Sequence, residues 1–216
     1  GDKARDGETA LVDGHTVGVY NSLKGDFIWQ ANVRPAYAWY DGQVKRMTLN
    51  DTYATGEGTT AARINLGGPV ATVADDSAKI FPFKRMLGKQ AVDPTQRKVI
   101  VPHLFGTGGF WATIPAVYDE ATVLANWTTS LTTGAKAAGQ IADTDAYTGL
   151  DTGATPWSWA YTEMWMGINH EVALKGDTLG CTSCHGASTA EWDWAALGYT
   201  CDPMTGGAVA CGSRHP

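Results

Sequence analysis

The chain has 216 residues, a net charge of −6 at pH 7 and a pI near 5.2. This length favours one domain with its own hydrophobic core, and the acidity argues against nucleic-acid binding, which depends on basic patches. No apolar run of about 20 residues occurs, so no membrane-spanning helix is expected. Nine tryptophans and eight tyrosines, with only 18% charged residues, indicate packing against something large and flat, or an interface.

The first half of the chain predicts short strands and loops. Residues 27–40 are aromatic and partly alternating, which favours a strand broken at Pro35. Asp41-Gly42 is a hairpin signal, and residues 43–50 alternate again as a return strand. Residues 63–76 predict short extended pieces that are interrupted at Gly67-Gly68-Pro69.

The middle of the chain contains the best helix candidate. Three prolines exclude a long helix from residues 79–105, and residues 99–101 favour a strand there. A helix is predicted near residues 116–128, because Pro115 precedes it and apolar residues follow at roughly helical spacing.

Aromatic residues are concentrated before and after the cysteines. The run over residues 157–170 leads directly into the cysteine-containing segment, and residues 190–198 predict a short helix. We expect six rings to line a cofactor or an interface: Trp157, Trp159, Tyr161, Trp165, Trp192 and Trp194.

One pentapeptide carries the clearest chemical signal. Cys181 and Cys184, followed by His185, form Cys-x-x-Cys-His, the attachment motif of c-type haem. Two thiols at this spacing form thioethers with the two vinyl groups of haem, and the adjacent imidazole becomes the proximal iron ligand. A zinc site and a redox dithiol are the alternatives, but the loop-like, glycine-bounded flanks argue against the thioredoxin pattern.

The other two cysteines, Cys201 and Cys211, predict a disulfide. Haem c is attached outside the bacterial cytoplasm, where disulfides persist. The segment between the two residues contains Asp-Pro and Gly-Gly turn signals, so it can close on itself. Two buried thiols are the alternative.

The sixth position of the iron is assigned to His170. This residue lies eleven positions before Cys181, and a loop of that length reaches from one haem face to the other. Two imidazoles would make a low-spin, lower-potential haem suited to electron transfer. The alternatives are Met164 or Met166, His103, and an open site.

Several segments carry a family resemblance in a common order. They are Lys24-Gly25, Asn32 to Tyr40, Lys79 to Lys84, Gly88-Lys89-Gln90 with Asp93-Pro94, Val101-Pro102 with Leu104-Phe105, Met166 to His170, Cys181 to Gly186, and Leu197-Gly198-Tyr199 with Asp202-Pro203. Together they resemble the C-terminal part of the octahaem tetrathionate reductase family of multihaem c-type cytochromes. The resemblance implies haem binding, export and a distal-ligand role for the histidine of Asn169-His170. Tetrathionate, nitrite or hydroxylamine reduction is not implied, because that family has eight haems and this chain has one motif.

The expected fold is irregular and loop-rich α+β, with short antiparallel strands, a few short helices and a C-terminal haem c segment. Residues 1–216 form one domain in this interpretation: residues 1–155 are mainly β and loop, and residues 156–216 bind haem. No catalytic residue is predicted. The expected location is periplasmic or extracellular, after removal of a signal peptide.

The predicted function is electron transfer through one covalent haem c with bis-histidine ligation. Redox proteins are the expected partners, and the aromatic content also favours a homo-oligomer or filament. One alternative is a haem enzyme or sensor with an open axial site and a pocket formed by Lys84, Lys89, Asp93 and His103. A subunit or fragment of a larger multihaem reductase is another.

Overall fold

The computed structural model describes residues 3–22, 24–29, 33–113, 119–169, 174–186, 192–207 and 210–212. It divides into two compact units. The first, here called the α2 unit, comprises Gly1–Val33, Thr48–Ile64 and Lys89–Tyr161. The second, the Cys-His unit, comprises Arg34–Met47, Asn65–Gly88 and Thr162–Pro216. Strands β8 (Lys79–Asp93) and β11 (Pro156–Gly167) each continue from one unit into the other. The expectation of a single domain stays a prediction.

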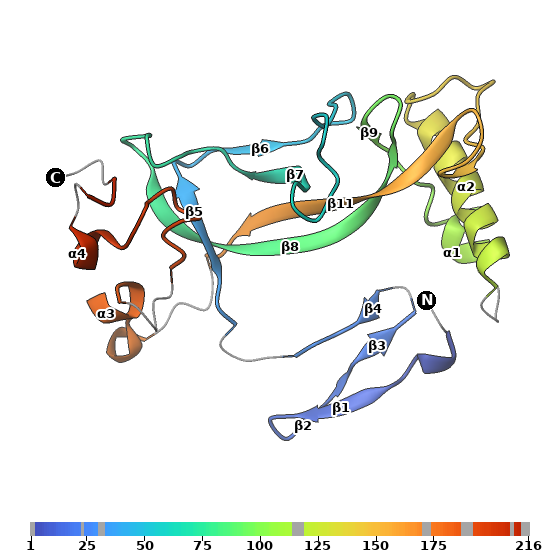
Figure 1. Cartoon of the computed structure of the whole chain (residues 1–216). Helices are drawn as coiled ribbons and strands as arrows, with labels where there is room; N and C mark the ends of the chain where they lie inside the picture. The colour runs from blue at the N-terminus through green and yellow to red at the C-terminus, as the bar shows by residue number, and fades with distance from the viewer. Residues whose placement is uncertain are drawn as a thin grey trace. The chain divides into compact units, whose positions relative to one another are not determined.

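The α2 unit begins with a 3-10 turn (η1, Lys3–Arg5) and two small antiparallel pairs (Figure 1). Asp13 and Gly14 join the strands of the first pair, and both have positive φ, 50° and 80°, as a tight hairpin turn requires. The strands of the two pairs are β1 (Thr9–Val12) with β2 (His15–Gly18), and β3 (Tyr20–Asn21) with β4 (Gly25–Asp26).

Helix α2 runs over Glu120–Ala137, so it begins four residues later and ends nine residues later than the predicted 116–128. Asp119 caps its start, because the Asp119 side chain accepts from the Thr122 N–H at 3.2 Å. Gly139, with φ +68°, donates to the Lys136 carbonyl just beyond its end. The predicted start, residues 116–118 with Pro115, lies outside the described residues.

The core of the α2 unit forms where α2 packs on strands. Its buried members are Ala91, Ile100, Leu131, Ala135, Tyr147 and Trp157. Gly134 lets the helix come close to the preceding segment, because a Cβ at this position would lie 2.1 Å from the Val101 carbonyl oxygen. Figure 1 shows α2 beside the short helix α1 (Phe110–Thr113), and α2 also contacts β10 (Gly149–Leu150). β10 pairs in parallel with the start of β11, and β9 (Lys98–Val99) pairs with the end of β8.

The Cys-His unit is built on a sheet with strand order β5-β8-β11-β7-β6. The additional strands are β5 (Ala36–Tyr40), β6 (Val44–Arg46) and β7 (Ile64–Pro69). β5 pairs antiparallel with β8, and β6 pairs antiparallel with β7. Short helical turns follow at the C-terminal end: η2 (Lys175–Asp177), α3 (Cys181–Cys184) and α4 (Pro203–Gly206).

The hairpin predicted at Asp41-Gly42 is wrong. Strands β5 and β6 flank this dipeptide, but they lie at opposite ends of the strand order and pair with β8 and β7. Locally, the Asp41 carboxylate accepts from the Gln43 N–H at 2.9 Å, which bends the chain without bringing the flanking strands together.

Two further local predictions need correction. Gly67 and Gly68 do not interrupt the chain: both lie within β7, where a Cβ at Gly68 would come within 3.0–3.2 Å of the Trp165 side chain. Glycine therefore lets an indole lie on the strand. The described part of 190–198 forms turns rather than a short helix, with Gly198 donating to the Ala195 carbonyl at 3.0 Å.

The mixed sheet and few short helices confirm the predicted loop-rich α+β class. The prolines of residues 79–105 do exclude a helix there, and the long strand β8 accommodates Pro82, whose carbonyl accepts from the Ile168 N–H at 3.0 Å. None of the helices within the described ranges is long and apolar enough to cross a membrane.

Candidate haem-binding site

The two motif cysteines lie on one helical turn. Helix α3 begins after the extended residue Gly180, and the His185 N–H donates to the Cys181 carbonyl at 2.9 Å. Residues three apart on a helix share a face. The exposed Cys181 and the half-buried Cys184 therefore present two thiols together. His185 leaves the helix with extended backbone angles, φ −116° and ψ 137°.

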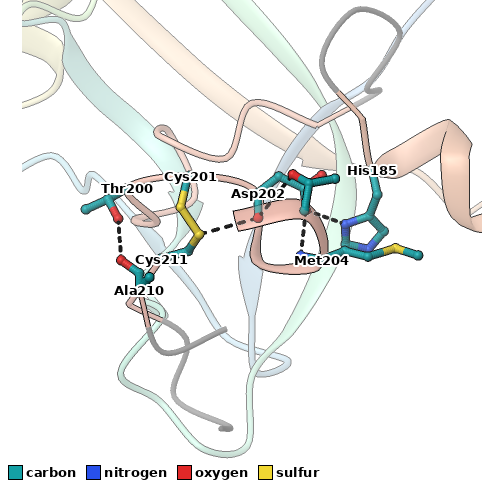
Figure 2. Close-up of a disulfide and its surroundings, with 8 residues drawn as sticks. His185, Thr200, Cys201, Asp202, Met204, Ala210 and Cys211 are labelled. Carbon is teal, nitrogen blue, oxygen red and sulfur yellow. Dashed lines mark hydrogen bonds and ion pairs between the residues drawn. A yellow bond between two sulfur atoms is a disulfide. The ribbon is translucent and has the colours of Figure 1, made fainter. Parts of the chain in front are cut away.

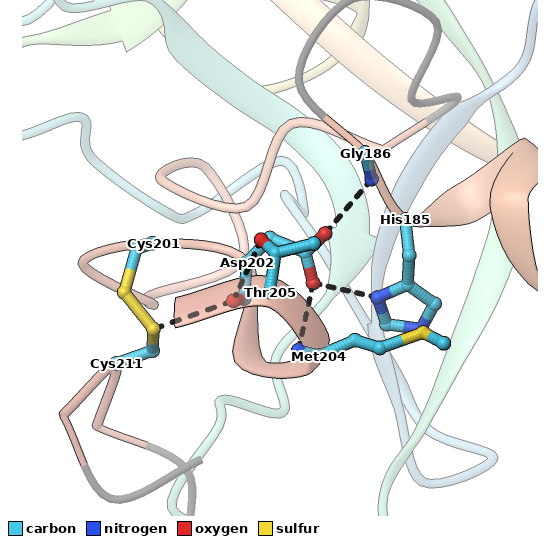
Figure 3. A network of polar contacts seen from close by, with 7 residues as sticks. All are labelled: His185, Gly186, Cys201, Asp202, Met204, Thr205 and Cys211. Atoms are coloured by element: carbon cyan, nitrogen blue, oxygen red, sulfur yellow. Dashed lines mark hydrogen bonds and ion pairs between the residues drawn. A yellow bond between two sulfur atoms is a disulfide. The ribbon is translucent and has the colours of Figure 1, made fainter. Parts of the chain in front are cut away.

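Asp202 holds the imidazole of His185. His185 Nδ1 lies 2.6 Å from Asp202 Oδ1, and the Gly186 N–H donates to Oδ2 at 2.9 Å (Figure 3). An ionised carboxylate only accepts hydrogen bonds, so the proton of this contact lies on Nδ1. In a neutral imidazole the other nitrogen, Nε2, then carries the lone pair that binds a metal.

Asp202 is itself held by the backbone. It caps α4, where the Met204 N–H donates to its Oδ1 at 2.9 Å, and Pro203 occupies the first helical position. Burial would raise the pKa of Asp202, but hydrogen bonds from His185, Met204 and Gly186 outweigh it and leave the pKa below its usual value. Asp202 therefore faces His185 as a carboxylate.

Indole rings surround the imidazole. Trp194 stacks on His185, with ring centroids 4.9 Å apart and an interplanar angle of 23°. Trp192 lies 6.3 Å from the same ring and packs edge-on to Trp194. The buried cluster of Trp39, Ala78, Leu197 and Tyr199 supports both indoles.

The two indoles beside His185 have unsatisfied donors. Among the described residues, the buried side-chain nitrogen and oxygen atoms without a hydrogen-bond partner are Nε1 of Trp192 and Nε1 of Trp194. Buried polar atoms are nearly always hydrogen-bonded in native proteins, so these two donors are available to an acceptor beyond the described residues. The carboxylate groups of haem are acceptors of the required kind.

The predicted disulfide between Cys201 and Cys211 is present (Figure 2). Cys201 directly precedes Asp202, and Cys211 Sγ lies 3.4 Å from the Asp202 carbonyl oxygen. The Thr200 N–H donates to the Cys211 carbonyl at 3.2 Å, which ties the ends of the loop together a second time. Since both sulfurs are used in this bond, these cysteines are not zinc ligands alongside Cys181 and Cys184.

The distal-ligand prediction, His170, lies outside the described residues. Of its alternatives, Met166 lies at the exposed end of β11 and Met164 is half-buried within the same strand. His103 belongs to the α2 unit, where its Nε2 lies 3.2 Å from the Thr107 carbonyl and its backbone carbonyl accepts from Ser130 Oγ.

Two residues of the open-site alternative, Asp93 and Lys89, have contacts within the α2 unit. Asp93 is buried and accepts from the backbone N–H groups of Thr95 and Gln96, at 2.9 and 2.8 Å. Lys89 places its ammonium 4.6 Å from the ring centroid of Tyr161. These contacts stabilise turns and strands of the α2 unit.

The aromatic run is divided between two roles. Trp157 is fully buried in the core of the α2 unit, and Trp159 packs edge-on against it, so Trp157 does not line a cofactor surface. Trp165 packs against Phe83 in the Cys-His unit. Of the six predicted rings, Trp192 and Trp194 are the ones in contact with His185.

Asp202 is the residue of the site that the sequence did not reveal. In the sequence, Asp202-Pro203 is a turn signal and part of the family resemblance, and neither assigns a role to the carboxylate. An aspartate directly before proline is typical of a helix start, where its carboxylate is oriented by backbone N–H groups. Nothing in the spacing of residues 185 and 202 indicated that this carboxylate would meet the proximal imidazole.

The donor set fits a covalently attached haem. It comprises two thiols on one turn, an imidazole with its Nδ1 already bonded, two buried indole donors, and exposed apolar side chains at Leu174 and Leu179 just before the motif. Fold and site together define a c-type cytochrome.

The comparisons agree with this class. The chain matches the family model of bacterial cytochrome c over residues 1–188 and belongs to that family. Its structure is similar to the octahaem cytochrome c of Shewanella oneidensis, with a TM-score of 0.67 and 30% sequence identity. The match covers 94% of this chain and 42% of that one, so the chain spans less than half the length of its structural relative. Comparison with curated proteins gives no match. Membership of this family implies covalently bound haem c.

Proposed function

We propose that this chain carries electrons through a single haem c held by Cys181 and Cys184, with His185 as proximal ligand. The observation that supports this most directly is the contact between His185 Nδ1 and Asp202, because it leaves Nε2 as the metal-binding nitrogen. When bound, the haem supplies a one-electron Fe(III)/Fe(II) couple.

Each residue of the site has a role in holding the group. The thiols of Cys181 and Cys184 would anchor it as thioethers, and Trp194 would keep the imidazole from rotating by stacking on it. The Nε1–H groups of Trp192 and Trp194 would donate to the haem carboxylates. The indoles would also exclude water from the proximal face, which favours a stable ligand bond.

His170 is the proposed distal ligand. Bis-histidine ligation closes the iron to small molecules and suits electron transfer. The alternative, an open site for catalysis or sensing, makes the opposite prediction for ligand binding. Tetrathionate reductase activity is not part of the proposal, since the relative with 30% identity is described as an octahaem cytochrome c and this chain spans 42% of it.

The proposed location is the periplasm or the cell exterior. The Cys201–Cys211 disulfide supports an oxidising compartment, and haem c attachment takes place there in bacteria. The proposed partners are redox proteins. The expected homo-oligomer or filament draws no support from the family match or from the described residues, and it is not proposed.

Haem attachment is tested with paired cysteine variants. The chain is produced in a bacterial periplasm with the haem c attachment machinery, and haem is measured by intact mass and by the spectrum of its pyridine complex. We expect one haem per wild-type chain and none in Cys181→Ser/Cys184→Ser. The matched control is Cys201→Ser/Cys211→Ser, which removes the same number of sulfur atoms and should keep the haem. A wild-type chain without covalent haem refutes the proposal.

The distal ligand is tested by spectroscopy. Wild-type protein should show a low-spin spectrum that carbon monoxide and cyanide leave unchanged. His170→Ala should become high-spin and bind both, while His103→Ala, the matched histidine control in the α2 unit, should behave as wild type. A wild-type haem that binds carbon monoxide readily favours the open-site alternative instead.

A further inference from the structure

Three hydrogen bonds converge on one carboxylate in the Cys-His unit. Asp202 accepts from His185 Nδ1 at 2.6 Å, from the Gly186 N–H at 2.9 Å and from the Met204 N–H at 2.9 Å (Figure 3). The side chain of Asp202 is only 9% exposed, against 26% for His185. This arrangement differs from a surface ion pair, because backbone donors on both sides orient the carboxylate before the imidazole meets it.

The same carboxylate is fixed along the chain by covalent and steric constraints. Cys201 precedes Asp202 and is bonded to the fully buried Cys211. Gly206, one turn later, leaves room for the sulfurs, since a Cβ there would lie 2.6 Å from Cys211 Sγ. Figure 2 shows the disulfide and Asp202 side by side, with the Asp202 carbonyl facing Cys211 Sγ. The disulfide therefore constrains the backbone at Asp202.

The chemical consequence concerns the iron ligand. An imidazole that donates its Nδ1–H to a carboxylate shares the proton and becomes a more basic donor at Nε2. A more basic ligand stabilises Fe(III) more than Fe(II), so it lowers the reduction potential. A backbone carbonyl, being uncharged, would share that proton less strongly.

We infer that Asp202 is the positioning residue of the proximal ligand, that its carboxylate lowers the reduction potential of the haem by accepting from His185 Nδ1, and that the Cys201–Cys211 disulfide braces it. The inference rests on the proposed function, since it needs haem bound at His185.

The test compares reduction potentials of isosteric variants of the haem-loaded chain, measured by spectroelectrochemistry. Asp202→Asn keeps an oxygen acceptor but removes the charge, and we expect its potential to rise. Outer-shell partners change metal affinity by about tenfold or more. If the preference for Fe(III) falls about tenfold, the rise is about 59 mV for one electron. Asp202→Glu, which keeps the charge, should fall between Asp202→Asn and wild type.

The matched control is Asp193→Asn. Asp193 lies between the two indoles, and its carboxylate accepts from the Ala196 N–H at 3.0 Å. The substitution removes the same charge close to the site without touching His185. Its potential should stay near that of wild type. Equal shifts in Asp193→Asn and Asp202→Asn would reduce the effect to general electrostatics and overturn the inference.

The brace is tested with Cys201→Ser/Cys211→Ser. We expect its potential to rise in the same direction as that of Asp202→Asn, by less, because the carboxylate remains but is less well held. An unchanged potential overturns the role of the disulfide.

A measurement on wild-type protein covers the case in which Asp202 variants do not fold. In the diamagnetic Fe(II) protein, nitrogen-15 NMR should show a His185 Nδ1–H that is shifted downfield and exchanges slowly with solvent. A rapidly exchanging Nδ1–H contradicts the inference. Haem content separates the two failures: absence of covalent haem refutes the proposed function, whereas bound haem with an unmoved potential refutes the inference alone.

Discussion

The two compact units differ in whether the N–H groups of their buried tryptophans have hydrogen-bond acceptors. In the α2 unit, Trp157 is fully buried and its Nε1–H donates to Thr128 Oγ1 at 3.0 Å. In the Cys-His unit, Trp39 is satisfied in the same way, donating to the Leu197 carbonyl at 2.8 Å. Trp192 and Trp194 pack against the same cluster as Trp39, and their Nε1–H groups have no acceptor among the described residues. The buried indole of Trp157 in the α2 unit therefore has its hydrogen bond within the protein, whereas the Cys-His unit has two indole N–H groups available to a bound group.

A core truncation in the α2 unit should have the largest effect on stability. Leu131 is fully buried between α2 and the strands, so Leu131→Ala should lower the free energy of unfolding by about 2–5 kcal/mol. Urea denaturation measures this, and the haem spectrum of the folded protein should not change. Leu11→Ala is the control, because Leu11 is 73% exposed and should cost less than about 0.5 kcal/mol. Equal costs for both would contradict a packed core around α2.

Substitution of the two indoles should give the next largest loss of stability. The loss should depend on bound haem for Trp194 but not for Trp157. Trp157→Phe should lower the unfolding free energy by about 1–3 kcal/mol in both, because it removes a made hydrogen bond and buried volume. Trp194→Phe should change the haem-free protein by less than about 1 kcal/mol, because the lost N–H had no partner.

The haem-free reference for this comparison is the Cys181→Ser/Cys184→Ser chain. In haem-loaded protein, Trp194→Phe should cost clearly more, since the indole then donates to the cofactor. If Trp194→Phe has the same cost with and without haem, the indole does not serve the cofactor, and the contrast between the units disappears.

Loss of the ion pair between Arg85 and Glu163 should have the smallest effect on stability. Arg85 Nη2 lies 2.6 Å from Glu163 Oε2, and the Arg85 side chain is 43% exposed. Glu163→Gln should lower the unfolding free energy by about 0.2–1 kcal/mol at low salt. This difference should become smaller in about 1 M salt, where screening acts over about 3 Å, although Glu163 is only 15% exposed and is screened less than a surface carboxylate. A cost that salt does not reduce at all would show that packing on Trp165 matters more than the ion pair.

The hairpins show how far local signals predict the fold. Asp-Gly occurs at residues 6–7, 13–14 and 41–42. The hairpin is expected at 41–42, but it forms at 13–14. Gly14 and Gly42 both have positive φ, but only the first dipeptide also has it at its aspartate, Asp13. The outcome at 41–42 differs because β5 and β6 pair with β8 and β7, which follow later in the chain, instead of with each other. Pairing partners of that kind are decided by packing, which a local pattern does not encode.

For helix α2, local sequence patterns predict the element but not its bounds. Its existence was predictable from apolar spacing, but its start depends on the cap at Asp119 and its end on Gly139. The prolines of residues 79–105 exclude a helix there, but the sequence does not predict that Lys79–Asp93 forms one long strand, β8. The Pro82 carbonyl still takes part in the sheet region, accepting from the Ile168 N–H.

The sequence by itself determined the chemistry of the cysteines. The spacing of Cys181, Cys184 and His185 is a covalent property of the chain, and the separation of Cys201 and Cys211 allows their loop to close. Only the tertiary structure decided that Asp202, 17 residues after His185, meets its imidazole and that Trp194 stacks on it. The reason is physical: local spacing is set by bonds and angles, whereas a contact between distant residues forms only where burial of the intervening chain brings them together.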